Sequence, residues 1–161
     1  MTKAKKTAEA AVETEAAAPK PLKTNIHAIF GTDEKKEEDG AWVSVNEAYG
    51  LRIKVRRIKS DTAVKAYDKI LKEKFGEGAL RKPGDVTAEQ YIEVMKVQLA
   101  TAVLIDWKNL RDADTGAEIP YSLETSLALM EVRDFREFVY QAAEGRESFR
   151  AEEDKDAEGN L

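Results

Sequence analysis

The chain has 161 residues, with 26 Lys and Arg against 31 Asp and Glu, for a formal net charge of -5. This length suits one domain with a real core, and the negative charge argues against a protein that binds nucleic acid as a whole. The absence of cysteine excludes disulfides, thiolate metal sites and cysteine nucleophiles. The single histidine, His27, is expected at the surface. We therefore expect no metal site and no cofactor.

The two ends of the chain differ in composition from the middle. Residues 1–24 are rich in Ala, Lys, Glu and Pro and are predicted to be a disordered arm, and residues 150–161 form an acidic tail. Residues 25–149 are expected to fold as a single globular domain. No apolar run approaches the ~18–20 residues that cross a bilayer, and the N-terminus lacks the apolar region of a secretory signal. These features predict a protein of the cytoplasm that does not bind membranes.

The stretch "AWVSVNEAYGLRIKVRRIK" predicts a β-hairpin. Apolar residues alternate on both sides of a turn at Asn46–Gly50, and Leu51, Ile53 and Val55 share one strand face. The segment "IHAIF", from Ile26 to Phe30, could supply a third strand.

Helical periodicity begins after this hairpin. Ser60 is a plausible N-cap for a helix that stops at Gly76, and Thr87 with Gln90 forms a capping box for a long central helix that runs to Trp107. Two further helices are expected after caps at Ser122 and Asp134. The predicted fold class is α+β and mainly helical: a small N-terminal hairpin or three-stranded sheet followed by about four helices.

The stretch "DWKNLRDADTGAEIPYSLE", residues 106–124, has the highest local density of acids. Counted from Asp112 as an EF-hand loop, Gly116 falls at the fifth position and not the sixth, and Leu123 holds the twelfth position, so that Glu124 comes one residue too late to bind calcium. The acids also lack an enclosed setting for acid–base catalysis. We interpret the stretch as a polar turn between two helices, and we expect a protein that is not an enzyme.

Two kinds of candidate binding residue remain. Arg52, Lys54 and Arg56 alternate with apolar residues and line either a solvated face or a phosphate-binding surface within residues 51–59, although the aromatic residues of a stacking platform are missing. The candidate protein-binding residues are aromatic, and Tyr140 is the most displayed because it is off the apolar stripe of its helix. They are Trp107, Tyr121, Phe138 and Tyr140.

The order of several segments resembles the tail assembly chaperones of long-tailed bacteriophages of the siphophage type. The resemblance rests on "EEDGAWV", "LRIKVRRIKS", "LATAVLIDWKNLRDADTGAEIPYSLETSLALM" and "VRDFREFVYQAAEGRESF", and covers residues from about Phe30 to Phe149. It implies a non-enzymatic protein of the host cytoplasm that binds the tape-measure protein and helps to recruit tail-tube subunits. Self-association stays open.

Two rival functions also stay open. One is a structural virion protein of the tail or of the head–tail connector. The other is a nucleic-acid or regulatory binding module that uses the basic strand, which the acidic net charge disfavours.

Overall fold

The computed structural model describes residues 20–77 and 86–151, so most of the predicted arm and of the acidic tail lies outside the described residues. The fold is α+β and mainly helical, with one three-stranded antiparallel sheet of order β1-β2-β3, which confirms the predicted class. The strands are β1 (Ala41–Asn46), β2 (Leu51–Val55) and β3 (Leu104–Lys108). The α-helices are α2 (Asn25–Phe30), α3 (Glu34–Asp39), α4 (Asp61–Phe75), α5 (Ala88–Gln98), α6 (Leu123–Leu129) and α7 (Arg133–Glu144).

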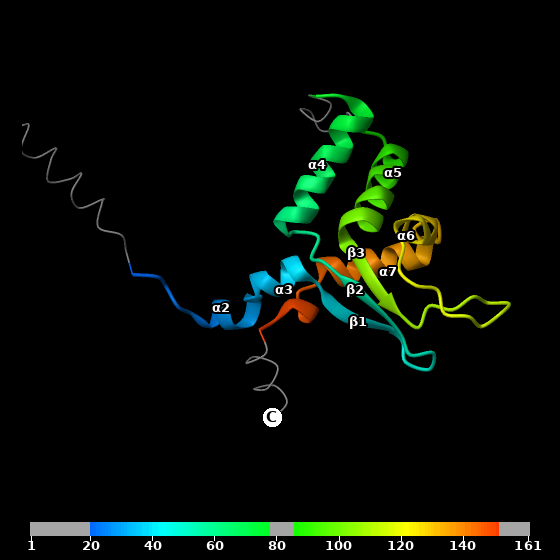
Figure 1. The fold of residues 1–161 in the computed structure, drawn as a ribbon. Helices are drawn as coiled ribbons and strands as arrows, with labels where there is room; N and C mark the ends of the chain where they lie inside the picture. The colour runs from blue at the N-terminus through cyan, green and yellow to red at the C-terminus, as the bar shows by residue number, and fades with distance from the viewer. Residues whose placement is uncertain (1–19, 78–85, 152–161) are drawn as a thin grey trace, which may run out of the picture.

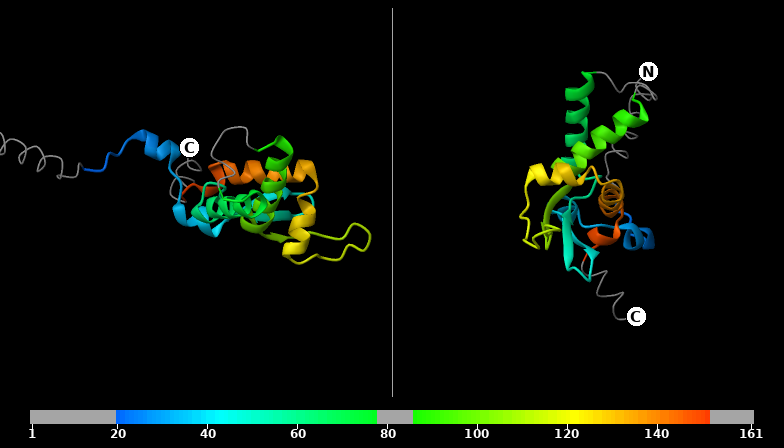
Figure 2. Two further views of the ribbon diagram at one scale, coloured as in Figure 1. Left: turned by 90° about the horizontal axis from the view of Figure 1, so that it is seen from above. Right: turned by 90° about the vertical axis from the view of Figure 1, so that its right-hand side faces the viewer.

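The helices lie around the sheet in three groups. Helices α4 and α5 pack side by side and project from one end of the sheet, whereas α7 packs on one sheet face against β2 (Figure 1). Helix α2 stands away from the body, on the side opposite α6 in both perpendicular views (Figure 2). Among the described residues, no helix covers most of the other face of the sheet (Figure 1).

The predicted hairpin of β1 and β2 is confirmed. Val43 pairs with Ile53, and the connecting turn is held by the Asn46 Oδ1 atom, which accepts a 3.2 Å hydrogen bond from the backbone N–H of Tyr49. Gly50 closes the turn with φ +63°, a conformation that glycine adopts without a steric penalty.

The expectation that Ile26–Phe30 forms the third strand is wrong, because this segment is helix α2. Thr24 and His27 form a reciprocal capping box, in which the Thr24 side chain accepts from the backbone of His27 and the His27 ring accepts from the backbone N–H of Thr24. His27 is exposed, as expected, and its ring helps to begin a helix.

The third strand instead comes from the end of the predicted central helix, so the expectation of a helix through Trp107 is wrong as well. Helix α5 ends at Gln98, a π-helical turn follows at Leu99–Val103, and β3 then pairs antiparallel with β2. Pairing satisfies the free edge of β2 and turns both Leu104 and Trp107 into the core. Helical spacing within the segment carries no information about that distant edge.

Three of the four predicted helix caps are confirmed. Ser60, Thr87 and Ser122 each accept a hydrogen bond from the backbone N–H three residues later. The cap expected at Asp134 is wrong: α7 begins at Arg133 and has no side-chain cap.

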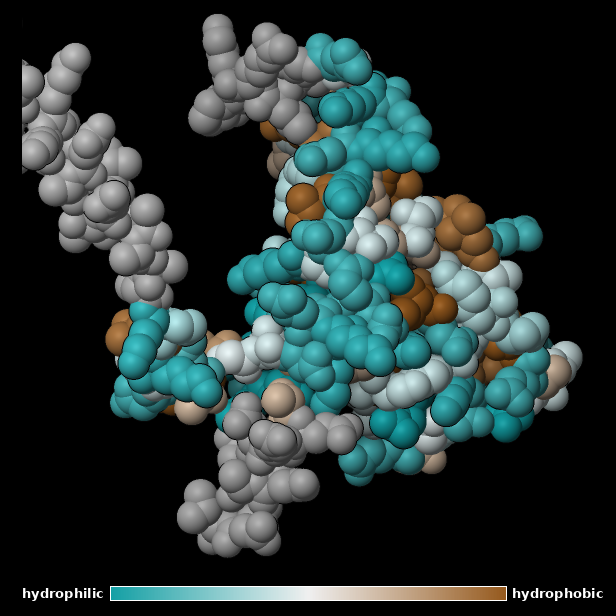
Figure 3. Space-filling view, turned by 60° about the vertical axis from the view of Figure 1, so that its left-hand side comes forward, coloured by the Kyte–Doolittle hydropathy of each residue, from teal (hydrophilic) through white to brown (hydrophobic). Residues whose placement is uncertain are grey.

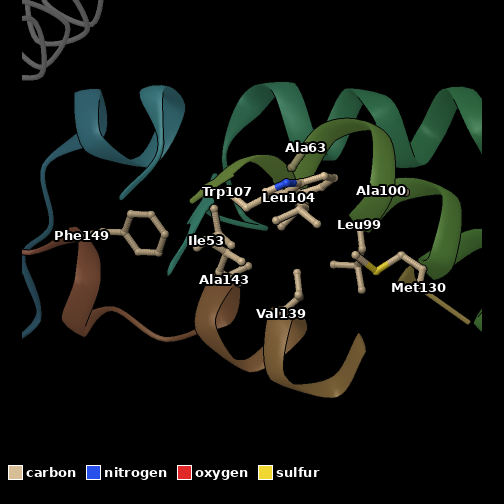
Figure 4. Close-up of a cluster of buried hydrophobic side chains, with 12 residues drawn as sticks. Ile53, Ala63, Leu99, Ala100, Leu104, Trp107, Met130, Val139, Ala143 and Phe149 are labelled. Atoms are coloured by element: carbon tan, nitrogen blue, oxygen red, sulfur yellow. The ribbon is translucent and has the colours of Figure 1, made fainter. Parts of the chain in front are cut away.

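The main core lies between the sheet and α7. Figure 4 shows Val139 and Ala143 of α7 pointing toward Ile53 and Leu104 of the sheet. Phe149 was expected on the last helix, but it lies in a separate 3₁₀ helix (Glu147–Phe149) and is fully buried. A second, smaller cluster joins α4 to α5 and contains Ile70, Leu71 and Val94.

Candidate binding surfaces

The acid-rich stretch after β3 is a polar turn, as the spacing predicted, although it follows a strand and not a helix. The Asp112 Oδ1 atom accepts 2.9 Å hydrogen bonds from the backbone N–H groups of Asp114 and Thr115. These hydrogen bonds, the one from Thr115 first, stabilise the carboxylate and hold the pKa of Asp112 below its ordinary value. Gly116 follows with φ +72°. The carboxylate of Asp112 thus has a structural task in closing the turn.

Trp107 is a core residue, so the expectation that it contacts a partner is corrected. Its side chain is 6% exposed, and its indole N–H donates a 2.7 Å hydrogen bond to the carbonyl of Ile119. The ring of Tyr121 lies 4.7 Å from that of Trp107, and the Tyr121 hydroxyl donates to the carbonyl of Leu104. Together the contacts of the two rings hold the segment between β3 and α6, here called the connector, against β3.

Phe138 and Tyr140 are both half-buried and pack against the main core. Burial, followed by the nearby phenol of Tyr91, raises the pKa of Tyr140 above its ordinary value. Tyr140 lies near Tyr91, which is 43% exposed. A role for Tyr121, Phe138 and Tyr140 in binding a protein partner stays a prediction.

The three predicted basic residues do not share one surface. Arg52 and Lys54 lie on the uncovered face of the sheet, whereas Arg56 lies beyond the end of β2 and is turned into the molecule. The Arg56 guanidinium donates 2.6 Å hydrogen bonds to the carbonyls of Glu38 and Ala102. Arg56 therefore ties α3 to the π-helical turn, which corrects its assignment to the basic surface.

An acidic hollow of about 220 Å³ opens between α3 and the start of α4. The carboxylate of Glu38 accepts hydrogen bonds from the hydroxyl and backbone N–H of Thr62, and the hydroxyl is the main reason why the pKa of Glu38 is lowered. The carboxylate of Glu37 pairs with Arg57. Glu38 therefore stabilises the start of α4, and Glu37 forms an ion pair.

The structure exposes two groups of apolar side chains that the sequence pattern had not indicated as candidate binding residues. The first group, here called the α2 surface, comprises Leu22, Ile26, Ile29 and Phe30, which are 75%, 56%, 44% and 58% exposed. The second, called the α6 surface, comprises Leu123, Leu127 and Val132, which are 50%, 39% and 55% exposed. Ile26, Ile29 and Phe30 have the i, i+3, i+4 spacing of one helix face, a signal that the strand interpretation concealed.

Hydrophobic side chains do not merge into one large patch on the face seen in Figure 3. That face is mostly hydrophilic and carries small, separate hydrophobic areas. Isolated apolar groups of this kind fit contacts with short segments better than one extensive interface.

The described residues lack the features of two further kinds of site. No group of three or more His, Cys, Asp and Glu side chains within residues 20–77 and 86–151 is arranged to hold a metal ion. In the same residues, no helix has the length and apolar character needed to cross a membrane.

The fold and these surfaces define a small α+β domain with exposed apolar groups and a partly basic sheet face. The chain belongs to the YdaY prophage protein family, whose model matches residues 51–160, and it is therefore a phage-derived protein. No curated protein and no solved structure matches the chain significantly. The family match begins at β2 and so leaves out the α2 surface and β1.

Proposed function

We propose that this phage-derived protein is a tail assembly chaperone that binds the tape-measure protein and helps to recruit tail-tube subunits in the host cytoplasm. The phage origin of the family and the resemblance of its segments to such chaperones support the proposal. The observation that carries it is the presence of two exposed apolar surfaces on opposite sides of one small domain (Figures 1 and 2). Two separate surfaces suit a non-enzymatic protein that brings two partners together.

The α2 surface is the more accessible of the two. Helix α2 has no buried residue, and its capping box supports the helix without help from a core. The guanidinium of Arg146 lies 4.3 Å from the centroid of the Phe30 ring and links this helix face to the body. A short, capped helix with an apolar face can pack against an amphipathic helix of a partner.

The α6 surface is held more firmly. Leu123 and Leu127 lie one helical turn apart, and the buried Ser126 of the same helix donates a 2.9 Å hydrogen bond to the carbonyl of Ala100. That bond and the cap at Ser122 fix α6 on the body, so its outward leucines form a preformed contact surface. A long tape-measure helix exposes apolar side chains until the tube encloses it, and such a surface can shield them.

Co-expression with the tape-measure protein of the same prophage tests the proposal. The wild-type protein is expected to increase the soluble fraction of the tape-measure protein and to co-purify with it. The double variants Ile26→Asp with Phe30→Asp, and Leu123→Asp with Leu127→Asp, are each expected to lose capture of one partner. Tyr49→Asp is the matched control, because Tyr49 is 79% exposed but lies alone in the β1–β2 turn.

Two results would contradict this function. One is wild-type protein that neither solubilises nor co-purifies with the tape-measure protein. The other is its presence at a fixed stoichiometry in purified virions, measured by quantitative mass spectrometry, which would assign it to the structural proteins of the tail or connector.

A further inference from the structure

The uncovered face of the sheet carries an ordered set of side chains. Strand pairing places Trp42 opposite Lys54 and Lys54 opposite Asp106, and in the next row Ser44 lies opposite Arg52 and Arg52 opposite Lys108. Because side chains alternate along a strand, these residues point away from the core residues Ile53 and Trp107. We call this set the basic sheet face.

The cations of the basic sheet face have no acidic partner in the described part of the chain. No ion pair there involves Arg52, Lys54 or Lys108. The Asp106 Oδ1 atom accepts a hydrogen bond from the backbone N–H of Trp107. Three cations and one carboxylate thus leave the face positive, although the whole chain has a net charge of -5. This contrast predicts that the face attracts an acidic segment.

We propose that residues 152–161 of the chain bind across the basic sheet face. This segment, "EEDKDAEGNL", contains five acids and one lysine. The described chain reaches Ala151 just after the 3₁₀ helix at Glu147–Phe149, which contacts the edge strand β1. Ten extended residues reach about 33 Å, whereas a three-stranded sheet is about 10 Å wide. The acidic segment is therefore long enough to pass around β1 and cross the face.

An acidic peptide fits this face better than a nucleic acid. The ammonium of Lys108 lies 4.3 Å from the centroid of the Trp42 ring, so it occupies a ring face on which a base would stack. Trp42 is also half-buried. Carboxylates can pair with Arg52, Lys54 and Lys108 and leave the cation–π contact in place. Tethering raises the local concentration of the segment into the millimolar range, which makes weak surface ion pairs sufficient.

The two tryptophans provide a reporter and an internal control in one NMR spectrum. We compare the full-length wild-type chain with a full-length neutralised variant that carries E152Q, E153Q, D154N, D156N and E158Q. The Trp42 indole signal and the backbone signals of Arg52, Lys54 and Lys108 are expected to shift between the two proteins. The indole signal of Trp107, whose N–H is bonded to Ile119 inside the fold, is expected to stay in place. About 0.5 M salt should remove the difference.

Charge reversal on the face tests the location. The variant Arg52→Glu with Lys108→Glu is expected to abolish the effect of neutralising the tail, whereas Lys65→Glu, an exposed change on α4, should leave that effect intact. The proposal is overturned if tail neutralisation shifts only signals of residues adjoining the altered positions.

A single-stranded oligonucleotide provides the second arm. If it shifts the signals of the basic sheet face only in the neutralised variant, the acidic segment masks the face and the proposal is supported. Equal shifts with and without the acidic charges would overturn the proposal and identify nucleic acid as the occupant. None of these readouts uses the tape-measure protein or a tail-tube subunit, so failure here is distinct from failure of the tail assembly function.

Discussion

Arg56 and Ala102 are 46 residues apart in the chain, yet the guanidinium of Arg56 donates a 2.6 Å hydrogen bond to the Ala102 carbonyl. The same side chain also donates a hydrogen bond to the carbonyl of Glu38, and this bond holds α3 against the body. Arg52, four residues earlier in the chain, faces solvent on the basic sheet face. The basic segment from Arg52 to Arg56 therefore contains residues with different roles, and stability measurements separate them.

Arg56→Met is expected to lower the free energy of unfolding by about 2–3 kcal/mol, because two hydrogen bonds from a charged group are lost and two carbonyls lose their partner. Arg52→Met should change it by less than about 0.5 kcal/mol, as is usual for an exposed substitution. Urea unfolding followed by circular dichroism measures both. Similar losses of unfolding free energy for the two variants would mean that the hydrogen bonds of Arg56 do not stabilise the fold.

Trp107→Ala is expected to cost about 3–5 kcal/mol of stability, because it empties a large volume between β3 and the connector. Tyr121→Phe keeps the ring contact and removes only the hydroxyl that bonds Leu104, so about 1 kcal/mol is expected. Chemical denaturation of both variants tests the order of these effects. If Trp107→Ala were nearly neutral, the tryptophan would be a surface residue available to partners, as first expected from the sequence.

Alanine substitutions at two glycines with positive φ, Gly116 and Gly40, distinguish the cost of backbone strain from the cost of steric overlap. At Gly116, with φ +72°, an added Cβ meets nothing within 4 Å, so Gly116→Ala should cost only the conformational penalty of roughly 1–2 kcal/mol. At Gly40, with φ +90°, the added Cβ would lie 2.6 Å from the Ile105 Cδ1 atom and 3.1 Å from the Val55 carbonyl oxygen. Gly40→Ala is therefore expected to cost at least 1 kcal/mol more. Thermal unfolding of the two variants under the same conditions makes the comparison.

The turn at Asp112 predicts a pH-dependent contribution to stability. Hydrogen bonds lower the pKa of the carboxyl in the folded state, so its contribution is fully present above the ordinary value of about 3.9. It is lost as the pH falls through the lower folded-state pKa. The stability difference between the wild type and Asp112→Ala should thus be constant near neutral pH and shrink below about pH 4.

Denaturant titrations between pH 7 and pH 2.5 measure this difference. Asp114→Ala is the control, because the Asp114 side chain has no hydrogen bond in the described structure while its backbone N–H serves the same turn. A difference for Asp112→Ala that grows on acidification would contradict the assigned sign.

Much of the secondary structure was predictable because local chemistry specifies it. Three helices begin after a residue whose side-chain oxygen accepts a hydrogen bond from a nearby backbone N–H group, namely Ser60, Thr87 and Ser122. The alternation around Asn46–Gly50 predicts the hairpin, since one strand face must meet the core. The Asp and Gly residues from Asp112 to Gly116 predict a polar turn, and the Asp112 side chain closes it by accepting from nearby backbone N–H groups.

The errors arose where distant residues decide the conformation. Leu104–Lys108 follows the periodicity of a helix but forms β3, because the edge of β2 offers backbone partners and both Leu104 and Trp107 gain burial there. Ile26–Phe30 has the composition of a strand but no neighbouring edge, and the Thr24–His27 capping box makes it a helix. Among the candidate site residues, Trp107 and Arg56 were misplaced because of contacts with distant residues: the pairing of β3 with β2 turns Trp107 into the core, and hydrogen bonds to Glu38 and Ala102 draw Arg56 inward.

The sequence by itself determined the fold class, the hairpin, three helix starts and the polar turn, since these depend on periodicity and on contacts within a few residues. Only the tertiary structure decided which residues are left outside. Folding buries Trp107, draws in Arg56, and exposes the α2 and α6 surfaces together with the basic sheet face. Exposure depends on which elements pack together across the whole chain, and that information is not contained in any one segment.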